Sequence, residues 1–284
     1  MDLYPTVTAR SGAYPLLPRT PHLHLQQRLF SEGSEFSHLV RDTFQLFNDT
    51  DTTQNYLLLP TTELTLLFLF TDVSATSLLC GPMTSARSLE LPQRSTVYCL
   101  RLRCGCGDWL TDRDLSSLTD RVTPLAAFAE DLPLLQQQLA ESTSFQQRNA
   151  HIFHWLDRQG GRSYQSMAML RRCLALIEQH NGQITVSELA QAAGCSERYL
   201  SRVFRRRVGV STKTQCELVQ LHHSLQTMQT ASPKSLLHIA VACGYFDQAH
   251  MNRHYRRFLH CSASEARTGQ FPQHAPSLLS SQTV

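Results

Sequence analysis

Arginine side chains recur on two segments of the sequence at spacings that place them on one face of an α-helix. Arginine dominates the cations of the whole chain, because only two of its 26 basic residues are lysine. A guanidinium is a planar fork that pairs with phosphate oxygens and with O6 and N7 of guanine, while Asn and Gln amides pair with N6 and N7 of adenine. The pattern therefore predicts a surface that contacts double-stranded DNA. The candidate contact residues are Arg198, Ser201, Arg202, Arg205, Gln248, Asn252, Arg253 and Arg256.

The first arginine face requires two short helices that cross. Thr185 and Glu188 have the spacing of a capping box, which opens a short helix that stops at Gly194. Ser196 can cap a second helix, and Ala190 provides the small residue needed where the two helices cross. These signals predict a helix-turn-helix whose second helix exposes the arginines to a major groove.

The arrangement recurs about 50 residues further along the chain, which makes an internal repeat. Ser235 can cap the first helix of the second unit, Ala240 is equivalent to Ala190, and Gly244 is equivalent to Gly194. The turn of the second unit is one residue longer. Between the units, residues 212–228 are predicted to form a connecting helix.

Residues 167–268 resemble the tandem helix-turn-helix DNA-binding domain of AraC/XylS-type bacterial transcription regulators. The resemblance implies two recognition helices in successive major grooves on one face of DNA. We expect a regulator that activates or represses transcription, with RNA polymerase as a partner and a cytoplasmic location. It rests on these stretches: Ile184–Ala190, Ala193–Ser196, Tyr199–Phe204, Gly209–Ser211, Ile239–Ala240, Cys243–Tyr245, Asp247–Gln248, Arg253 and Phe258.

The sequence departs from the family pattern at five positions. Thr212 and Ala263 stand where the family usually has Pro, and His260 stands where it has Gly. Phe246 replaces a small capping residue, and Gln220 replaces an Arg of the connecting helix. Most departures fall in the second unit or after a recognition helix.

The N-terminal part of the chain differs in charge and pattern. Residues 166–271 carry 13 basic and 6 acidic residues, whereas residues 1–165 carry 13 basic and 17 acidic ones. Short apolar runs broken by Pro or Gly predict strands up to about residue 125, followed by helices over 132–139 and 145–156. The expected fold is α+β. It comprises a β-rich domain over 1–160 that senses a small-molecule effector or partner, a break at Gly160–Gly161, a DNA-binding domain over 165–268 and a disordered tail over 272–284.

Composition excludes several other classes of protein. The apolar run Leu66–Phe70 is far shorter than the roughly 20 residues of a membrane span, and the start of the chain lacks the pattern of a signal peptide. Nine scattered cysteines do not form a secreted disulfide framework. The sequence contains no phosphate-binding loop or hydrolase motif, so we expect no catalysis, cofactor or metal.

Three further hypotheses stay open at this stage. A homodimer is possible through the apolar face of residues 132–158. An alternative function is a protein-interaction anti-activator whose second unit no longer reads DNA. A third is a thiol- or metal-responsive regulator that uses the cysteine cluster formed by Cys80, Cys99, Cys104 and Cys106.

Overall fold

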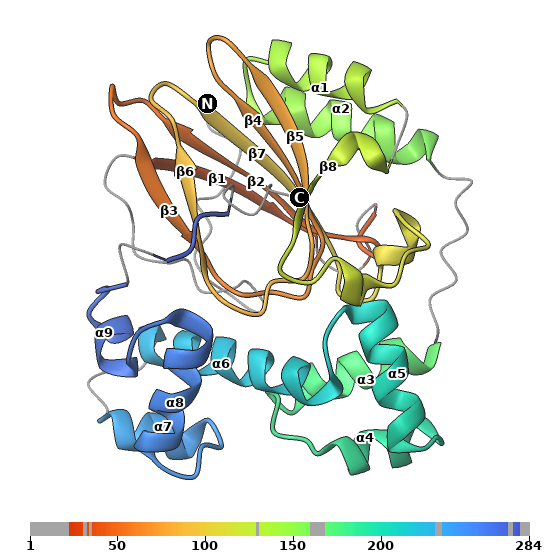
Figure 1. Cartoon of the computed structure of the whole chain (residues 1–284), viewed down its shortest axis with the longest axis vertical. Helices are drawn as coiled ribbons and strands as arrows, with labels where there is room; N and C mark the ends of the chain where they lie inside the picture. The colour runs from red at the N-terminus through yellow and green to blue at the C-terminus, as the bar shows by residue number, and fades with distance from the viewer. Residues whose placement is uncertain are drawn as a thin grey trace.

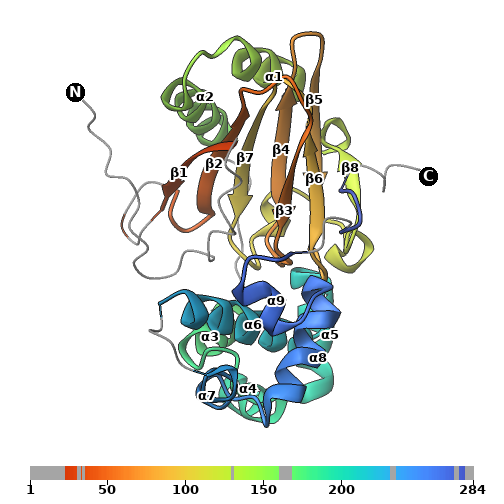
Figure 2. The same cartoon turned by 90° about the vertical axis from the view of Figure 1, so that its left-hand side faces the viewer.

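The computed structural model describes residues 23–30, 33, 36–128, 131–159, 168–230, 235–271 and 275–278. The predicted break at Gly160–Gly161 and the start of the expected DNA-binding domain at 165–167 lie outside these residues, as do residues 1–22. Figures 1 and 2 show a β-rich N-terminal half with a helical C-terminal half beneath it, which confirms the predicted α+β class.

An antiparallel sheet forms the centre of the N-terminal half, with the strand order β1-β2-β7-β4-β5-β8. A separate ribbon of β3 paired with β6 lies beside it. The strands are β1 (Leu23–Leu29), β2 (Val40–Asn48), β3 (Gln54–Leu58), β4 (Thr65–Phe70), β5 (Ala75–Cys80), β6 (Arg87–Leu91), β7 (Thr96–Leu102) and β8 (Val122–Pro124).

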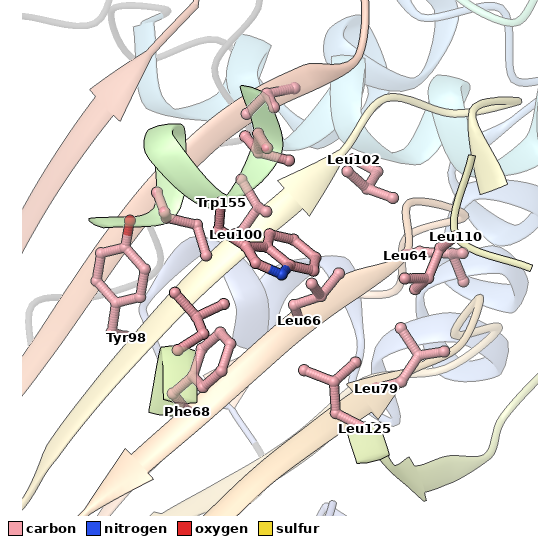
Figure 3. Close-up of a cluster of buried hydrophobic side chains, with 14 of the residues drawn as sticks. Leu64, Leu66, Phe68, Leu79, Tyr98, Leu100, Leu102, Leu110, Leu125 and Trp155 are labelled. Carbon is pink, nitrogen blue, oxygen red and sulfur yellow. The ribbon is translucent and has the colours of Figure 1, made fainter. Parts of the chain in front are cut away.

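Both faces of the sheet are covered, and this explains why β4 is apolar throughout. Leu66 and Phe68 point to the face covered by helices α1 (Leu132–Glu141) and α2 (Phe145–Arg158), where Trp155 packs with them (Figure 3). Leu67 and Leu69 point to the opposite face, in the cluster that includes the β3–β6 ribbon. Alternate residues of a strand face opposite sides, so a strand buried on both sides needs apolar residues at every position.

The two helices predicted after the strands are confirmed as α1 and α2. Short 3₁₀ turns precede them at η1 (Gly107–Trp109), η2 (Leu115–Ser117) and η3 (Leu125–Ala127). None of the described helices is both long enough and apolar enough to cross a membrane.

The C-terminal half consists of helices joined by short turns. Its helices are α3 (Ala168–Gln179), α4 (Val186–Ala193), α5 (Glu197–Val208), α6 (Thr212–Thr230), α7 (Leu236–Ala242), α8 (Gln248–Leu259) and α9 (Ala263–Arg267). The predicted connecting helix over 212–228 is confirmed as α6.

The segment that follows α9 returns to the N-terminal half. Ser88 of β6 donates its backbone N–H to the carbonyl of Pro276 at 3.0 Å and accepts one from Leu278 at 2.8 Å. The side chain of Leu278 is 1% exposed and packs in the cluster beneath the β3–β6 ribbon. The expectation of disorder over 272–284 was therefore wrong for residues 275–278, because an apolar side chain finds a site on a strand edge that the local sequence does not reveal.

Candidate nucleic-acid interface

The first unit of the repeat, α4 and α5, forms as its sequence predicts. The Thr185 hydroxyl accepts a hydrogen bond from the backbone N–H of Glu188, whose carboxylate accepts the backbone N–H of Thr185 at 2.8 Å. Gly194 ends α4 with φ of 64°, in the left-handed region that glycine adopts without a steric cost. Ser196 then caps α5, and Ala190 is 4% exposed at the crossing of the two helices.

The second unit, α7 and α8, repeats this plan with one difference at the turn. Ser235 caps α7, Ala240 is 0% exposed, and Gly244 has φ of 76°. Asp247 is the residue that caps α8, since its side chain accepts the backbone N–H of His250 at 2.6 Å. The family comparison that assigned a capping position to Phe246 was wrong by one residue, because the longer turn moves the cap forward.

The predicted DNA-contacting side chains lie on the solvent side of both second helices. Arg198, Arg202 and Arg205 of α5 are exposed, and Ser201 is half-buried. In α8, the exposed residues are Arg253 and Arg256 and the half-buried ones are Gln248 and Asn252. The apolar sides of the same helices are buried through Leu200 and Phe204 in α5 and through Met251, Tyr255 and Phe258 in α8.

Both second helices have the same orientation relative to the N-terminal half. The carbonyl of Gly209, directly after α5, accepts a hydrogen bond from the Thr119 hydroxyl at 2.7 Å. Near the end of α8, the Phe258 carbonyl accepts the backbone N–H of Ala86 at 2.7 Å. A helix of 12 residues is about 18 Å long, so the N-terminal ends lie well away from these contacts. In both views α4 and α7 lie at the edge of the helical half farthest from the strands (Figures 1 and 2).

The arginines of the second helices divide into paired and unpaired groups. Arg207 donates to the Asp108 carboxylate at 2.7 Å, and Arg257 donates to Glu217 at 2.8 Å. Within the described part of the chain, Arg198, Arg205 and Arg253 have no ion-pair partner. These three guanidinium groups remain available to an external anion, whereas Arg207 and Arg257 serve contacts within the protein.

Asn252 has a structural partner that sequence reasoning missed. Its side-chain oxygen accepts the backbone N–H of Ala263, at the start of α9, at 3.0 Å. The bond depends on the departure from Pro at position 263, since proline has no N–H to donate. The side-chain oxygen of Asn252 is therefore already engaged when no DNA is present.

The contacts that attach the helical half to the N-terminal half also escaped prediction. Thr62 donates to the side chain of Gln215 at 2.8 Å, and a ring nitrogen of His222 lies 2.8 Å from the carbonyl of Pro60. Burial lowers the pKa of His222 to about 3, so this imidazole is neutral near pH 7. The partners are more than 150 residues apart, and local sequence patterns carry no signal for such pairs.

An apolar cavity of about 70 Å³ lies between the central sheet and the β3–β6 ribbon. Tyr56, Leu67 and Met83 contribute to its lining, together with Arg101. The Arg101 guanidinium forms an ion pair with the buried carboxylate of Asp42. The volume is enough for only a few water molecules, so any larger organic molecule would have to widen the cavity.

The cysteine cluster is mostly buried. Burial raises the pKa of Cys80 to about 12 and the pKa of Cys99 well above its usual range, which keeps both thiols protonated. A protonated thiol is a poor nucleophile and a poor metal ligand. No three His, Cys, Asp or Glu side chains among the described residues gather in a way that could hold a metal ion.

The helix-turn-helix assignment is supported by a family match. Residues 189–269 match the model of a family described as helix-turn-helix domain. This match confirms a helix-turn-helix domain within the segment that resembles the AraC/XylS type, and it supports a DNA-binding transcription regulator. No curated protein matches the chain at a significant level.

Several solved structures are similar to the chain. One is a transcriptional regulator from Chromobacterium violaceum with an AraC-type DNA-binding domain, 24% identical over 38% of this chain and 97% of that one, with a TM-score of 0.34. Another is ToxT from Vibrio cholerae, 10% identical over 87% of this chain and 98% of that one, with a TM-score of 0.41. A third is ToxT with a bound unsaturated fatty acid, 12% identical over 90% and 97% of the two chains, with a TM-score of 0.38.

Proposed function

We propose that this protein regulates transcription by inserting α5 and α8 into successive major grooves on one face of a DNA duplex. The observation that carries the proposal is the shared orientation of the two helices: both C-terminal ends contact the N-terminal half, and both arginine faces are exposed. A common orientation allows the two helices to approach one face of DNA together, about one helical turn apart.

The proposed readers of base edges are Arg198, Ser201 and Arg202 in α5 and Gln248, Asn252 and Arg253 in α8. Arg205 and Arg256, nearer the C-terminal ends, are assigned to phosphate contacts. Asn252 would use its side-chain nitrogen, because its oxygen already accepts the N–H of Ala263. In the second unit, this leaves Arg253 as the residue best suited to bidentate pairing with guanine.

Salt-dependent binding of the full chain to DNA tests this function. Neutralising about 6 phosphates predicts a slope near −5 for the logarithm of the association constant against the logarithm of salt concentration. The DNA is first selected from a random pool with the full chain. Failure to select any sequence, combined with a flat salt dependence, would contradict the proposal.

A matched pair of charge removals separates local from general effects. Arg202→Ala is expected to weaken binding to the selected sequence and to relax base choice in one half of the site. Arg158→Ala removes the same charge from the exposed end of α2, on the N-terminal half, and should leave the binding unchanged. Equal effects of the two changes would mean that Arg202 contributes to binding only through the overall charge of the protein.

The N-terminal half is proposed to modulate DNA binding when a small apolar effector enters the cavity beneath the β3–β6 ribbon. The cavity is small, so entry would displace side chains of a cluster that also contains Leu278. Substituting Asp108 and Thr119 together by Ala would break the contacts with Arg207 of α5 and with Gly209 directly after it in the full chain. Modulation predicts altered promoter response in this variant, and an unchanged response would contradict coupling between the halves.

Homodimer formation and contact with RNA polymerase complete the proposal. Sedimentation of the full chain with and without selected DNA tests the dimer, and a monomer under both conditions would remove it. Transcription in vitro with purified RNA polymerase tests whether the protein activates or represses a promoter that carries the selected sequence.

The anti-activator alternative is motivated by the second unit, whose Asn252 is partly engaged and whose α8 ends at a non-glycine residue in the left-handed region, His260. It predicts that changes in α8 leave DNA binding intact. Selection with the Arg253→Ala variant decides between the two functions, since a reading role alters the selected sequence and an anti-activator role does not.

A further inference from the structure

The side chain of Phe246 is large and aromatic, yet it is almost wholly exposed to solvent. Its side chain is 88% exposed, whereas its neighbour Tyr245 is 3% exposed in the core of the second unit. Burial of a Phe side chain stabilises a fold, and almost none of this stabilisation is gained here within the folded chain. Packing within the fold therefore gives no reason for an aromatic residue at this position.

Comparison of the two units identifies Phe246 as the extra residue of the longer turn. The backbone N–H of Cys195 bonds to the carbonyl of Ala190 at 3.0 Å, and that of Tyr245 bonds to the carbonyl of Ala240 at 2.9 Å. These bonds align Cys195 with Tyr245. In the first unit the capping residue follows at once, whereas in the second unit Phe246 comes before the capping residue Asp247.

The position of Phe246 places it at the end of α8 that faces away from the N-terminal half. The carbonyl of Phe258, near the opposite end of α8, bonds to Ala86 of that half. Phe246 precedes the first residue of the helix, Gln248, by two positions, and the exposed Ala249 follows it. Phe246 and Ala249 thus flank the proposed base-reading residue Gln248 in the sequence, at the N-terminal end of α8.

In the major groove, the 5-methyl group of thymine is the apolar group on a base edge, and Phe and Ala side chains are suited to contact it. We propose that Phe246, together with Ala249, contacts a thymine methyl group and makes the second unit prefer thymine at that position. The inference rests on the proposed DNA-binding function. It gives the second unit a specificity determinant that the first unit lacks.

The test replaces single thymines by deoxyuridine, which removes only the 5-methyl group. With DNA selected by the wild-type full chain, one replacement in the second half of the site is expected to weaken binding about fourfold, the value of one buried methyl group. Phe246→Ala should lose most of this difference between thymine and deoxyuridine DNA, because only the Ala249 methyl group remains to contact the base. Replacing thymines in the half of the site that α5 reads should affect binding equally in the wild type and in Phe246→Ala.

Val241→Ala is the matched control. Val241 is 61% exposed on α7, so the change removes exposed apolar surface from the same unit without touching the turn before α8. This variant should retain the fourfold preference. A thermal melt of each variant checks folding, and Phe246→Ala should melt with the wild type because its ring packs on little else.

The outcomes separate the thymine contact from the function on which it rests. If the wild type selects no sequence, the proposed DNA-binding function is contradicted, and the proposed thymine contact is contradicted with it. If the wild type selects a sequence but Phe246→Ala retains the preference for thymine, only the contact is overturned. A Phe246→Ala variant that keeps this preference but loses activation would assign the ring to a protein partner instead.

Discussion

The two helix-turn-helix units share a plan but end their helices differently. A Cβ at Gly194 would meet no atom within 4 Å, whereas a Cβ at Gly244 would lie 2.3 Å from the side-chain oxygen of Gln183. After α5, Gly209 takes φ of 88° against the N-terminal half; after α8, His260 takes φ of 61°. The first unit therefore has glycine at both left-handed helix ends, while the second places a strained side chain at one of them.

This difference shows that a repeat conserves its crossing geometry more strictly than its ends. Both units keep a buried alanine where their helices meet, because a larger side chain would push the helices apart. The ends tolerate variation, since a residue such as histidine can adopt the left-handed region at a modest cost. The first unit also contacts the N-terminal half through the Arg207–Asp108 ion pair. Its geometry is therefore fixed both by its own helix crossing and by this contact.

The largest expected effect comes from a charge placed at a helix crossing. Ala240→Arg buries a guanidinium where the native side chain is 0% exposed, and should lower the free energy of unfolding by at least about 3 kcal/mol. Ala190→Arg should act similarly on the first unit. Urea titrations followed by circular dichroism measure both changes, and two stable variants would refute the assigned crossings.

Acidification should weaken the second unit in preference to the first. His254 is buried where the first unit has Val203, and burial lowers its pKa to about 4, although Glu217 lies 4.0 Å away. The pKa of His254 in the folded protein is below its unfolded value near 6.5, so the folded state binds fewer protons than the unfolded state as the pH falls below 6.5. The free energy of unfolding therefore has its full value above pH 6.5 and decreases as the pH falls toward 4, by up to about 1.4 kcal/mol per pH unit.

Hydrogen exchange at pH 7 and at pH 5 measures this effect helix by helix. Amides of α8 should lose protection at the lower pH more than amides of α5. The His254→Val variant, which copies the residue of the first unit, should remove the difference. An equal pH response in the variant and the wild type would assign the acid sensitivity to another group, such as His222.

Truncating one arginine in each unit compares their contributions to DNA recognition. Arg202→Ala and Arg253→Ala are each expected to cost about 1–3 kcal/mol, a loss of a few-fold to roughly 100-fold in affinity. Each should relax the base preference of its own half-site only. Binding titrations on DNA altered in one half at a time test this, and unchanged preference in both variants would contradict the assigned faces.

The smallest expected effects concern the two positions where the family has proline. Thr212 and Ala263 are the first residues of α6 and α9, where proline is favoured. The Thr212 hydroxyl is buried and has no hydrogen-bond partner in the described structure, so Thr212→Pro should stabilise by about 0.5–1 kcal/mol. Ala263→Pro should destabilise by about 1 kcal/mol, since it removes the bond to Asn252.

Thermal melts of the two proline variants should therefore shift in opposite directions. Adding Asn252→Ala to Ala263→Pro provides the control, because the cost of the proline should shrink once its partner is absent. Shifts of the same sign would mean that the Asn252–Ala263 bond contributes little to stability.

The sequence was sufficient for features that depend on near neighbours. The capping residues Thr185, Ser196 and Ser235 and the crossing at Ala190 are specified within one or two helical turns, and all are found where predicted. Repetition strengthened these predictions, since two weak patterns at a fixed offset support each other. The helical half could thus be derived almost completely.

Features that depend on distant partners could not be derived. The bond from Ala86 to Phe258 and the ion pair of Asp108 with Arg207 join residues that only the complete fold brings together. Asn252 was predicted only as a DNA contact, because local patterns show the residue on its helix face and not its bond to the backbone N–H of Ala263. Leu278 was assigned to a disordered tail because its surroundings are polar in sequence, although in space they are the apolar cluster of the sheet.

The return of residues 275–278 to β6 joins the end of the helical half to the sheet at a second place along the chain. The chain enters this half after α2, and it is fixed again where Leu278 inserts beneath the β3–β6 ribbon. Any rearrangement of the reading helices relative to the sheet must therefore carry or break the Leu278 contact, in addition to the direct contacts that Thr62, Thr119 and Ala86 make with the helical half.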